Sequence, residues 1–205
     1  MQKTMMKLMI SAAAVMAVHA SAMADDSPWL VRARAVNLSP ADRSDPIGGV
    51  GAADRIDVSD KTIPEVDVSY FFSPNIAAEL VLTYPQKHDV TLDGNPIGTF
   101  KHLPPTLLAQ YHFMPESGIN PYVGAGINYT TMSKVDLLGG KGGLDHDSWG
   151  LAVQAGADIK IDKSWSFNID LKKVQIGSDV TSSGTKISSV KVDPLMFGIG
   201  IGYRF

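Results

Sequence analysis

Histidine is the residue type in this sequence best suited to metal binding or acid–base chemistry, but its spacing favours neither. His88, His102, His112 and His146 are separated by intervals that match no common metal-ligand pattern. His146 lies between two aspartates in a polar stretch, where a solvated loop explains all three residues. The chain has no cysteine, which excludes disulfides, thiolate metal sites and a cysteine nucleophile. Because no Ser–His or paired-acid motif is present either, we predict no catalytic residue, no metal, no cofactor and no enzymatic activity.

A glycine-rich stretch at 139–143 invites comparison with a phosphate-binding loop. Its sequence is Gly-Gly-Lys-Gly-Gly, which lacks the Lys-Ser/Thr step of such loops. The formal net charge of the chain is -3, so there is no basic excess to grip a nucleic-acid backbone. We therefore predict a flexible loop at 139–143 and no nucleic-acid partner.

Charged side chains alternate with apolar ones along much of the chain, and this alternation identifies the elements that carry them. In 29–38, Arg32 and Arg34 share one face, whereas Val31, Ala33 and Ala35 share the other. A period of two is the pattern of a β-strand with two different faces. The pattern recurs in 29–38, 62–72, 76–85, 106–114, 121–131, 148–161, 165–176 and 195–205.

The connections between these segments alternate between short and long. Short turns follow 62–72, 106–114 and 148–161. The other connections are long and polar or glycine-rich: 39–61, 86–105, 132–147 and 177–188. Short periplasmic turns and long extracellular loops are typical of outer-membrane barrels. The sequence therefore predicts an all-β fold, a transmembrane barrel of about eight antiparallel strands with both ends on the periplasmic side.

The N-terminus carries the pattern of a secretory signal peptide. Lys3 and Lys7 give a basic region, 8–18 is apolar and uncharged, and Ala22-Met23-Ala24 is an Ala-x-Ala cleavage site. The apolar run is too short to span a bilayer as a helix. We therefore predict a cleaved signal peptide at 1–24, one barrel domain at 25–205, and an outer-membrane location in a Gram-negative bacterium.

A soluble lipocalin-like barrel also has alternating strands, so alternation alone does not separate it from a membrane barrel. Aromatic residues favour the membrane, because they recur near strand ends on the apolar face, as interfacial girdles do. They are Trp29, Tyr70, Phe72, Tyr84, Tyr111, Phe113, Tyr129, Trp149, Trp165, Tyr203 and Phe205. The last strand ends on Tyr203 and Phe205, which resemble the terminal signal read by the barrel assembly machinery. Expected partners are therefore this machinery and the lipid and lipopolysaccharide of the outer membrane.

Strand direction predicts a polar lower lumen and an apolar upper lumen. The residues expected to form a polar plug are Arg32, Arg34, Asp67, Glu79, Gln110, Gln154, Asp158, Asp170 and Arg204. Ordinary filling of a small barrel is the alternative interpretation of these residues. The residues expected to line an apolar channel above are Val36, Leu38, Ile63, Val81, Leu108, Ala152 and Met196. Local packing under the loops is the alternative for this second set.

Prolines in the predicted upper wall suggest where a ligand could leave sideways. Pro85, Pro104 and Pro105 lie near the ends of neighbouring strands, and proline donates no hydrogen bond to a sheet. We predict a possible lateral opening at these three residues. Simple termination of the strands by proline is the alternative.

The mature sequence resembles the OmpW family of outer-membrane proteins, which includes AlkL-like barrels. The residues that carry the resemblance lie in 29–34, 68–80, 108–113, 120–129 and 192–205, and the spacing matches over nearly the whole mature chain. The resemblance implies an eight-stranded barrel with a narrow apolar channel for passive uptake of small hydrophobic molecules. It also leaves open a non-transporting structural, adhesion or stress-related barrel, or a phage or colicin receptor.

Overall fold

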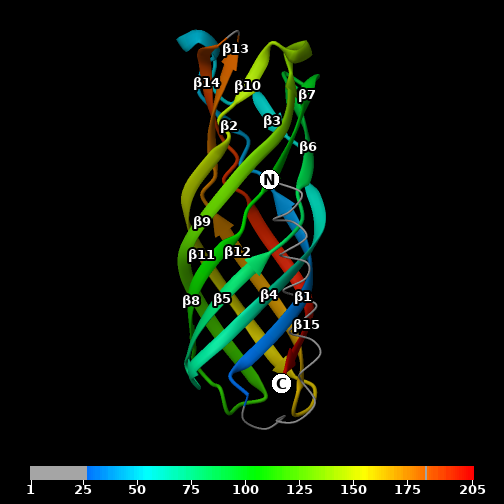
Figure 1. Cartoon of the computed structure of the whole chain (residues 1–205), viewed down its shortest axis with the longest axis vertical. Helices are drawn as coiled ribbons and strands as arrows, with labels where there is room; N and C mark the ends of the chain where they lie inside the picture. The colour runs from blue at the N-terminus through cyan, green and yellow to red at the C-terminus, as the bar shows by residue number, and fades with distance from the viewer. Residues whose placement is uncertain (1–26, 183) are drawn as a thin grey trace, which may run out of the picture.

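The computed structural model describes residues 27–182 and 184–205, and within them it is built almost wholly from β-strands. The predicted signal peptide at 1–24 lies outside the described residues. Eight strands form a closed antiparallel barrel (Figure 1). In order around the barrel they are β1 (Trp29–Ser39), β4 (Lys61–Ser73), β5 (Ile76–Leu82), β8 (Thr106–His112), β9 (Ile119–Leu137), β11 (Asp147–Lys160), β12 (Trp165–Val174) and β15 (Leu195–Arg204). The predicted eight-stranded antiparallel barrel is thus confirmed.

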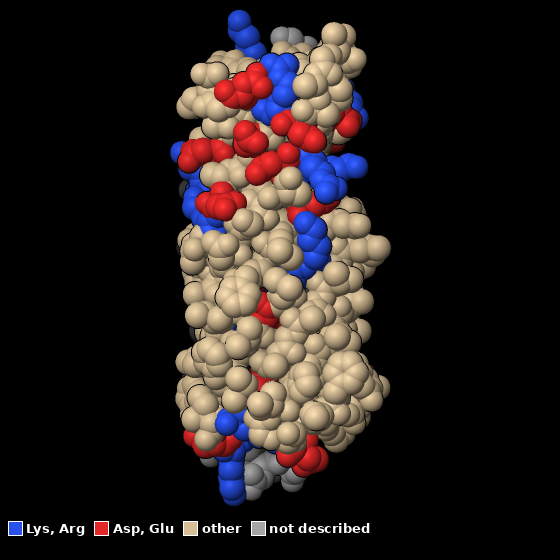
Figure 2. Space-filling view, turned by 180° about the vertical axis from the view of Figure 1, so that it is seen from behind, with Lys and Arg blue, Asp and Glu red and all other residues tan. Residues whose placement is uncertain are grey.

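Alternating side chains give this barrel two different surfaces. In β8, Leu108 and Gln110 are buried inside, whereas Leu107 and Tyr111 are 49% and 47% exposed on the outer face. Large apolar side chains exposed at this level are ordinary for a barrel whose outer surface contacts lipid. Figure 2 shows the result as a broad band with few charged residues, below a region where Lys, Arg, Asp and Glu are frequent.

The outward aromatic side chains form contacting pairs at the two edges of this apolar band. Towards the short turns, Trp165 and Tyr203 contact edge to face with ring centroids 4.9 Å apart. At the opposite edge, the centroids of Tyr129 and Trp149 lie 4.7 Å apart. These rings occupy the positions expected of interfacial girdles. Among the residues described, no helix is long and apolar enough to cross a membrane.

The long connections, predicted as loops, instead contain strands of their own. They carry β2 (Arg43–Ser44), β3 (Ile56–Val58), β6 (Gln86–Leu92), β7 (Asn95–Leu103), β10 (Gly142–Leu144), β13 (Gly177–Ser182) and β14 (Thr185–Lys191), with short 3-10 turns η1 (Ile47–Gly49) and η2 (Leu138–Gly140). The expectation of a flexible loop at 139–143 is wrong for Gly142 and Gly143, which pair with Ser182 and Thr181 in β13.

These additional strands extend the barrel wall on the side of the long connections, at the top of Figure 1. The basis of the extension is β9, which continues to Leu137, beyond its predicted end at Thr131, because β7 and β10 pair with its upper part. Pairing continues from β10 through β13 and β14 to β2, and from β7 through β6 to β3. The backbone N–H of Asp54 donates to the carbonyl of Ser44, joining the two ends of this ring.

Candidate functional site

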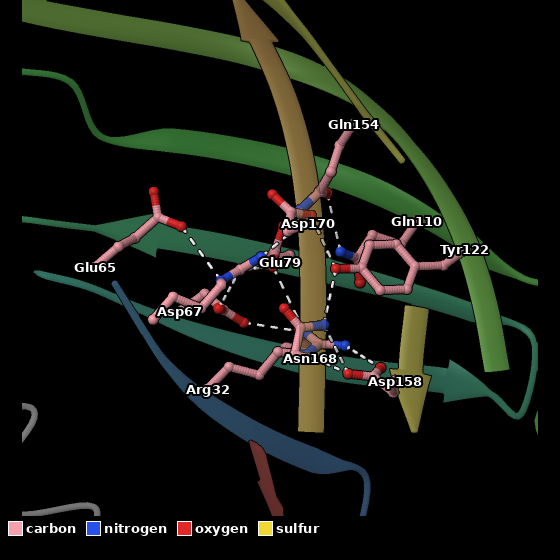
Figure 3. A network of polar contacts seen from close by, with 12 residues as sticks. Arg32, Glu65, Asp67, Glu79, Gln110, Tyr122, Gln154, Asp158, Asn168 and Asp170 are labelled. Carbon is pink, nitrogen blue, oxygen red and sulfur yellow. Dashed lines mark hydrogen bonds and ion pairs between the residues drawn. The ribbon is translucent and has the colours of Figure 1, made fainter. Parts of the chain in front are cut away.

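Charged side chains fill the lower half of the barrel interior, towards the short turns (Figure 3). Arg32 on β1 places Nη1 3.0 Å from Oδ1 of Asp67 on β4, and Nη2 2.6 Å from Oδ2 of Asp158 on β11. Arg34 pairs with the same Asp67, and its Nη2 lies 2.7 Å from Oε1 of Glu79 on β5. All five side chains are buried. Because an unpaired buried ion is very costly, this network fixes the positions of all its members.

A second group of contacts extends the network to the opposite wall. Lys172 on β12 places Nζ 3.0 Å from Oε1 of Glu65 on β4. Oδ2 of Asp170 accepts hydrogen bonds from the Tyr122 hydroxyl at 2.9 Å and from Nε2 of Gln154 at 2.7 Å. Neutral hydrogen-bond donors thus help to stabilise the buried carboxylate of Asp170 alongside the cations.

We call these residues the charged plug. Its members are Arg32, Arg34, Glu65, Asp67, Glu79, Gln110, Tyr122, Gln154, Asp158, Asn168, Asp170 and Lys172. Every polar residue predicted for the lower lumen lies in it except Arg204, which is half-buried at the rim with its guanidinium 3.9 Å from the centroid of the Phe71 ring.

Glycines on β15 make room for the two plug arginines. A Cβ on Gly200 would lie 2.1 Å from the carbonyl oxygen of Ala33 and 2.8 Å from Cγ of Arg34. A Cβ on Gly202 would lie 3.2 Å from Cγ of Arg32. The strand next to these long side chains therefore presents only backbone to the lumen at Gly200 and Gly202, which allows a narrow barrel to hold both guanidinium groups.

Above the plug, the interior is apolar and continuous into the extended upper wall. We call this cluster the apolar chamber: Val36, Leu38, Ile56, Val58, Ile63, Val81, Val90, Phe100, Leu108, Met132, Leu137, Ala152, Val174, Ile176, Val180, Val190, Val192 and Met196. All the residues predicted to line an apolar channel lie in it. The prediction missed the upper part, contributed by strands β3, β6, β7, β13 and β14, because these connections were interpreted as loops.

Two cavities lie within the chamber. The upper one is lined by apolar side chains from the extended wall, including Val90, Phe100 and Met132, and has about 20 Å³ of free volume. The lower one has about 10 Å³ and borders both Lys172 of the plug and Pro104 of the wall. Volumes of this size hold about one water molecule, so side chains fill most of the chamber in this structure.

The barrel wall has a seam beside the lower cavity, formed by residues 83–85 and 103–105. Below it, Val81 pairs with Thr106 in the β5–β8 ladder, and above it Gln86 pairs with His102 in the β6–β7 ladder. Within the described residues, no backbone hydrogen bond joins 83–85 to 103–105.

The predicted opening residues all lie in this seam. Pro85 lies on one side of it and Pro104 and Pro105 lie on the other. Each side is held instead by its outer neighbour: the Thr83 hydroxyl donates to the Pro64 carbonyl at 3.0 Å, and the Pro105 carbonyl accepts from the Tyr129 N–H at 3.1 Å. The seam is therefore the place where two sections of the wall meet without a β-ladder.

The predicted assembly residues lie at the end of β15, at the rim nearest the short turns. The rings of Tyr203 and Phe205 contact edge to face, with centroids 4.9 Å apart, and both residues are partly exposed. The backbone N–H of Phe205 donates to the carbonyl of Trp29 at 3.2 Å, which completes the pairing of the last strand with the first.

Comparisons with known proteins agree with this architecture. The chain is 32% identical to outer membrane protein W of Vibrio cholerae, over 98% of this chain and 100% of that protein. It is 27% identical to the dibenzothiophene metabolism operon protein PahQ of Pseudomonas aeruginosa, over 89% of this chain and 90% of that protein. The crystal structure of the outer membrane protein OprG from Pseudomonas aeruginosa superposes with a TM-score of 0.75 at 30% identity, covering 86% of this chain and 95% of OprG.

The family assignment rests on the whole barrel domain. A model of the OmpW family matches residues 26–205, which include every strand described above. Together with the full-length similarity to outer membrane protein W, this match also establishes the outer-membrane location predicted from the sequence. The chain belongs to the OmpW family of outer-membrane β-barrel proteins.

Proposed function

We propose that this protein is a channel for passive uptake of small hydrophobic molecules across the outer membrane. The observation that carries the proposal is the apolar chamber, which lies directly above a charged plug. An apolar solute in the chamber replaces contacts among apolar side chains with similar contacts of its own. The same solute moving through the plug would have to separate buried ion pairs, which costs about 3–5 kcal/mol for each pair.

The seam gives such a solute a route that avoids the plug. It borders the lower cavity through Thr83 and Pro104, and only side-chain packing has to yield there because no β-ladder closes it. In this proposal the solute enters the chamber from outside, passes from the upper to the lower cavity, and leaves sideways between residues 83–85 and 103–105. The lipid of the outer membrane then receives it.

A relative supports the chemical class of the solute. PahQ is named for an operon of dibenzothiophene metabolism, and dibenzothiophene is a small, apolar, aromatic molecule. The match covers 89% of this chain and 90% of PahQ. A solute of this kind fits a chamber lined by Val, Ile, Leu, Met and Phe side chains.

The small free volume of the chamber favours a second candidate function. The two cavities have about 20 and 10 Å³ of free volume, so uptake requires the upper strands to separate when a solute enters. A structural or adhesion barrel that transports nothing needs no such motion. Measurement of uptake therefore separates the two candidates.

The test is uptake of the fluorescent apolar probe N-phenyl-naphthylamine by whole cells that make the wild-type protein or a Leu108→Asp variant. Leu108 is 1% exposed within the chamber, so the substitution places an unpaired charge on the proposed path. We expect uptake to fall to the level of cells without the protein. The matched control is Leu108→Met, which keeps an apolar side chain of similar volume and is expected to retain uptake.

Heat-modifiable mobility on gels must show that both variants form the barrel. Equal uptake by folded wild type, folded Leu108→Asp and cells lacking the protein would support the non-transporting barrel and reject the proposed channel.

A further inference from the structure

Two buried histidines face each other in the upper wall, inside the apolar region. His88 on β6 and His102 on β7 are 0% and 1% exposed, and their rings stack with centroids 4.7 Å apart and planes 16° from parallel. The ring of Phe100 also stacks on His88, with the two ring centroids 5.7 Å apart. Polar rings buried among apolar side chains normally have every nitrogen hydrogen-bonded.

Both rings nevertheless leave one nitrogen without a partner. Nε2 of His88 and Nε2 of His102 are buried and make no hydrogen bond. Nδ1 of His88 lies 2.9 Å from the carbonyl oxygen of Ser59, and because a carbonyl only accepts, Nδ1 carries the proton. In a neutral ring the second nitrogen then has a free lone pair, so Nε2 of His88 is an unused hydrogen-bond acceptor.

The charge state of the two rings follows from their burial. Burial lowers the pKa of His102 to about 3, and the neighbouring His88 lowers it further. Burial also lowers the pKa of His88, although its bond to Ser59 acts in the opposite direction. Both imidazoles are therefore neutral at pH 7, and each can donate through one nitrogen and accept through the other.

The pair lies between the two cavities of the chamber. Along β6, the inward residue after His88 is Val90, which lines the upper cavity. Along β7, inward-facing His102 is preceded by Phe100 of the upper cavity and followed by Pro104 of the lower cavity. A molecule that moves from one cavity to the other passes the level of these two rings.

We propose that His88 and His102 form a binding site for the hydroxyl group of an apolar alcohol or phenol. This site rests on the proposed uptake function and narrows its substrate class. The hydroxyl hydrogen is donated to the free lone pair on Nε2 of His88, and the ring of His102 stacks on the His88 ring beside it. The rest of the ligand lies among the apolar side chains of the chamber, whose upper strands separate to admit it as the proposed uptake requires.

Other ligand classes fit the pair less well. Two rings only 16° from parallel do not direct their in-plane lone pairs at one point, as ligands of a single metal ion must. No group of three or more residues suited to metal binding is found in the described part of the chain. An anion would lack a countercharge beside two neutral rings. A neutral hydroxyl can donate to the free lone pair on Nε2 of His88 without introducing a charge.

The test compares naphthol with naphthalene, which differ only by the hydroxyl group. Binding of each probe to the full-length folded protein is measured by fluorescence titration and corrected for its partition into protein-free detergent micelles. We expect naphthol to bind about tenfold more tightly than naphthalene, the effect of one hydrogen bond to an otherwise unpaired buried nitrogen. The His88→Phe/His102→Phe variant is expected to lose this preference while it still binds naphthalene. His146→Phe, at an exposed loop position, is the matched control.

A direct measurement on the wild-type protein does not depend on how the variant folds. Addition of naphthol, but not naphthalene, is expected to shift the imidazole ¹⁵N resonance of Nε2 of His88. Equal affinities for the two probes, with no shift, would overturn the histidine site and leave the uptake function standing. Failure of both probes to bind would overturn the site together with the proposed function.

Discussion

Arg34 is the side chain on which most of the charged plug converges. Its guanidinium pairs with Asp67 and Glu79, and further atoms lie 3.3 Å from Glu65 and 3.2 Å from Asp170. Four carboxylates from three strands therefore share this buried cation, and each of them has Arg32 or Lys172 as a second partner. Arg34 therefore holds the strands of its partners together and also blocks the lower lumen.

We expect the substitution Arg34→Leu to destabilise the barrel by about 3–5 kcal/mol, because only Arg32 and Lys172 then remain to balance the buried carboxylates of the plug. The measurement is urea unfolding of the refolded protein in lipid. Arg55→Leu is the matched control, since Arg55 pairs with Asp93 on the exposed surface and its removal is expected to leave the unfolding midpoint unchanged. Equal shifts of the midpoint in the two variants would contradict a structural role for the plug.

At this scale, the sequence predicts the faces of the strands well and the partners within a face less well. Arg32 and Asp67 are expected in the lumen because they alternate with apolar neighbours, and in the structure the two side chains form an ion pair. Lys172 shares a face with Asp170 but was not among the residues predicted for the plug, and its partner Glu65 is a long-range contact. Tyr122 shares the parity of Gly124 and is buried in the lumen, but it was not among the predicted plug residues.

Among the elements, the β6–β7 hairpin is the one whose stability depends most clearly on pH. Its two histidines are neutral and buried in the folded state, with the pKa of each below its ordinary value because burial disfavours the charged ring. Lys61 and Asp89 are the charged groups that act on His88, in opposite directions. Unfolding of the hairpin releases both rings to bind protons near pH 6.5.

The hairpin is therefore expected to lose stability as the pH falls below about 6.5, since the unfolded state then binds more protons than the folded one. The loss continues towards pH 3 for His102, at about 1.4 kcal/mol per pH unit for each ring that titrates. Amide hydrogen exchange of β6 and β7 at pH 7.5 and 5 measures it, with correction for the intrinsic exchange rate. His102→Phe should reduce the pH dependence. An unchanged dependence in that variant would show that another group is responsible.

The elements of the upper wall were the main feature that the sequence did not predict. The connections 86–105 and 177–188 are rich in polar residues and glycine, so their alternation was interpreted as a loop composition. Yet Gln86, His88 and Val90 face inward at a spacing of two, which is the same signal that identified the barrel strands. The outer residues Lys87 and Asp89 are polar because this face meets water, and the inward Gln86 and His88 are polar as well, so the usual contrast between the two faces is weak.

For the whole molecule, closure of the barrel depends on the pairing of the last strand with the first. β15 pairs with β1 from Ser39 to Leu30, and Phe205 adds one more backbone hydrogen bond to Trp29. Deletion of Phe205, or its replacement by Asp, is expected to reduce insertion into the outer membrane several-fold while synthesis continues. Surface labelling and heat-modifiable mobility measure the inserted fraction. Insertion at the wild-type level would show that the terminal aromatic is not an assembly signal.

The lateral route is the central claim about the whole molecule, and a reversible cross-link across the seam tests it most directly. The chain has no cysteine, so Thr83→Cys/Pro104→Cys introduces a single thiol pair. Continuing the β5–β8 register beyond Val81 and Thr106 places these two positions opposite each other. Ala78→Cys/Ala109→Cys is the matched control, since these residues already pair in the closed part of the same ladder.

The measurement is uptake of N-phenyl-naphthylamine by whole cells before oxidation, after oxidation and after reduction, with disulfide formation verified by mass spectrometry. We expect oxidation of the seam pair to lower uptake several-fold, reduction to restore it, and the control pair to change nothing. Neutralisation of the plug pair by Arg32→Gln/Asp67→Asn is expected to leave uptake unchanged. If uptake instead rose in the neutralised plug and was unaffected by the seam cross-link, the solute would pass straight through the barrel and the lateral route would be wrong.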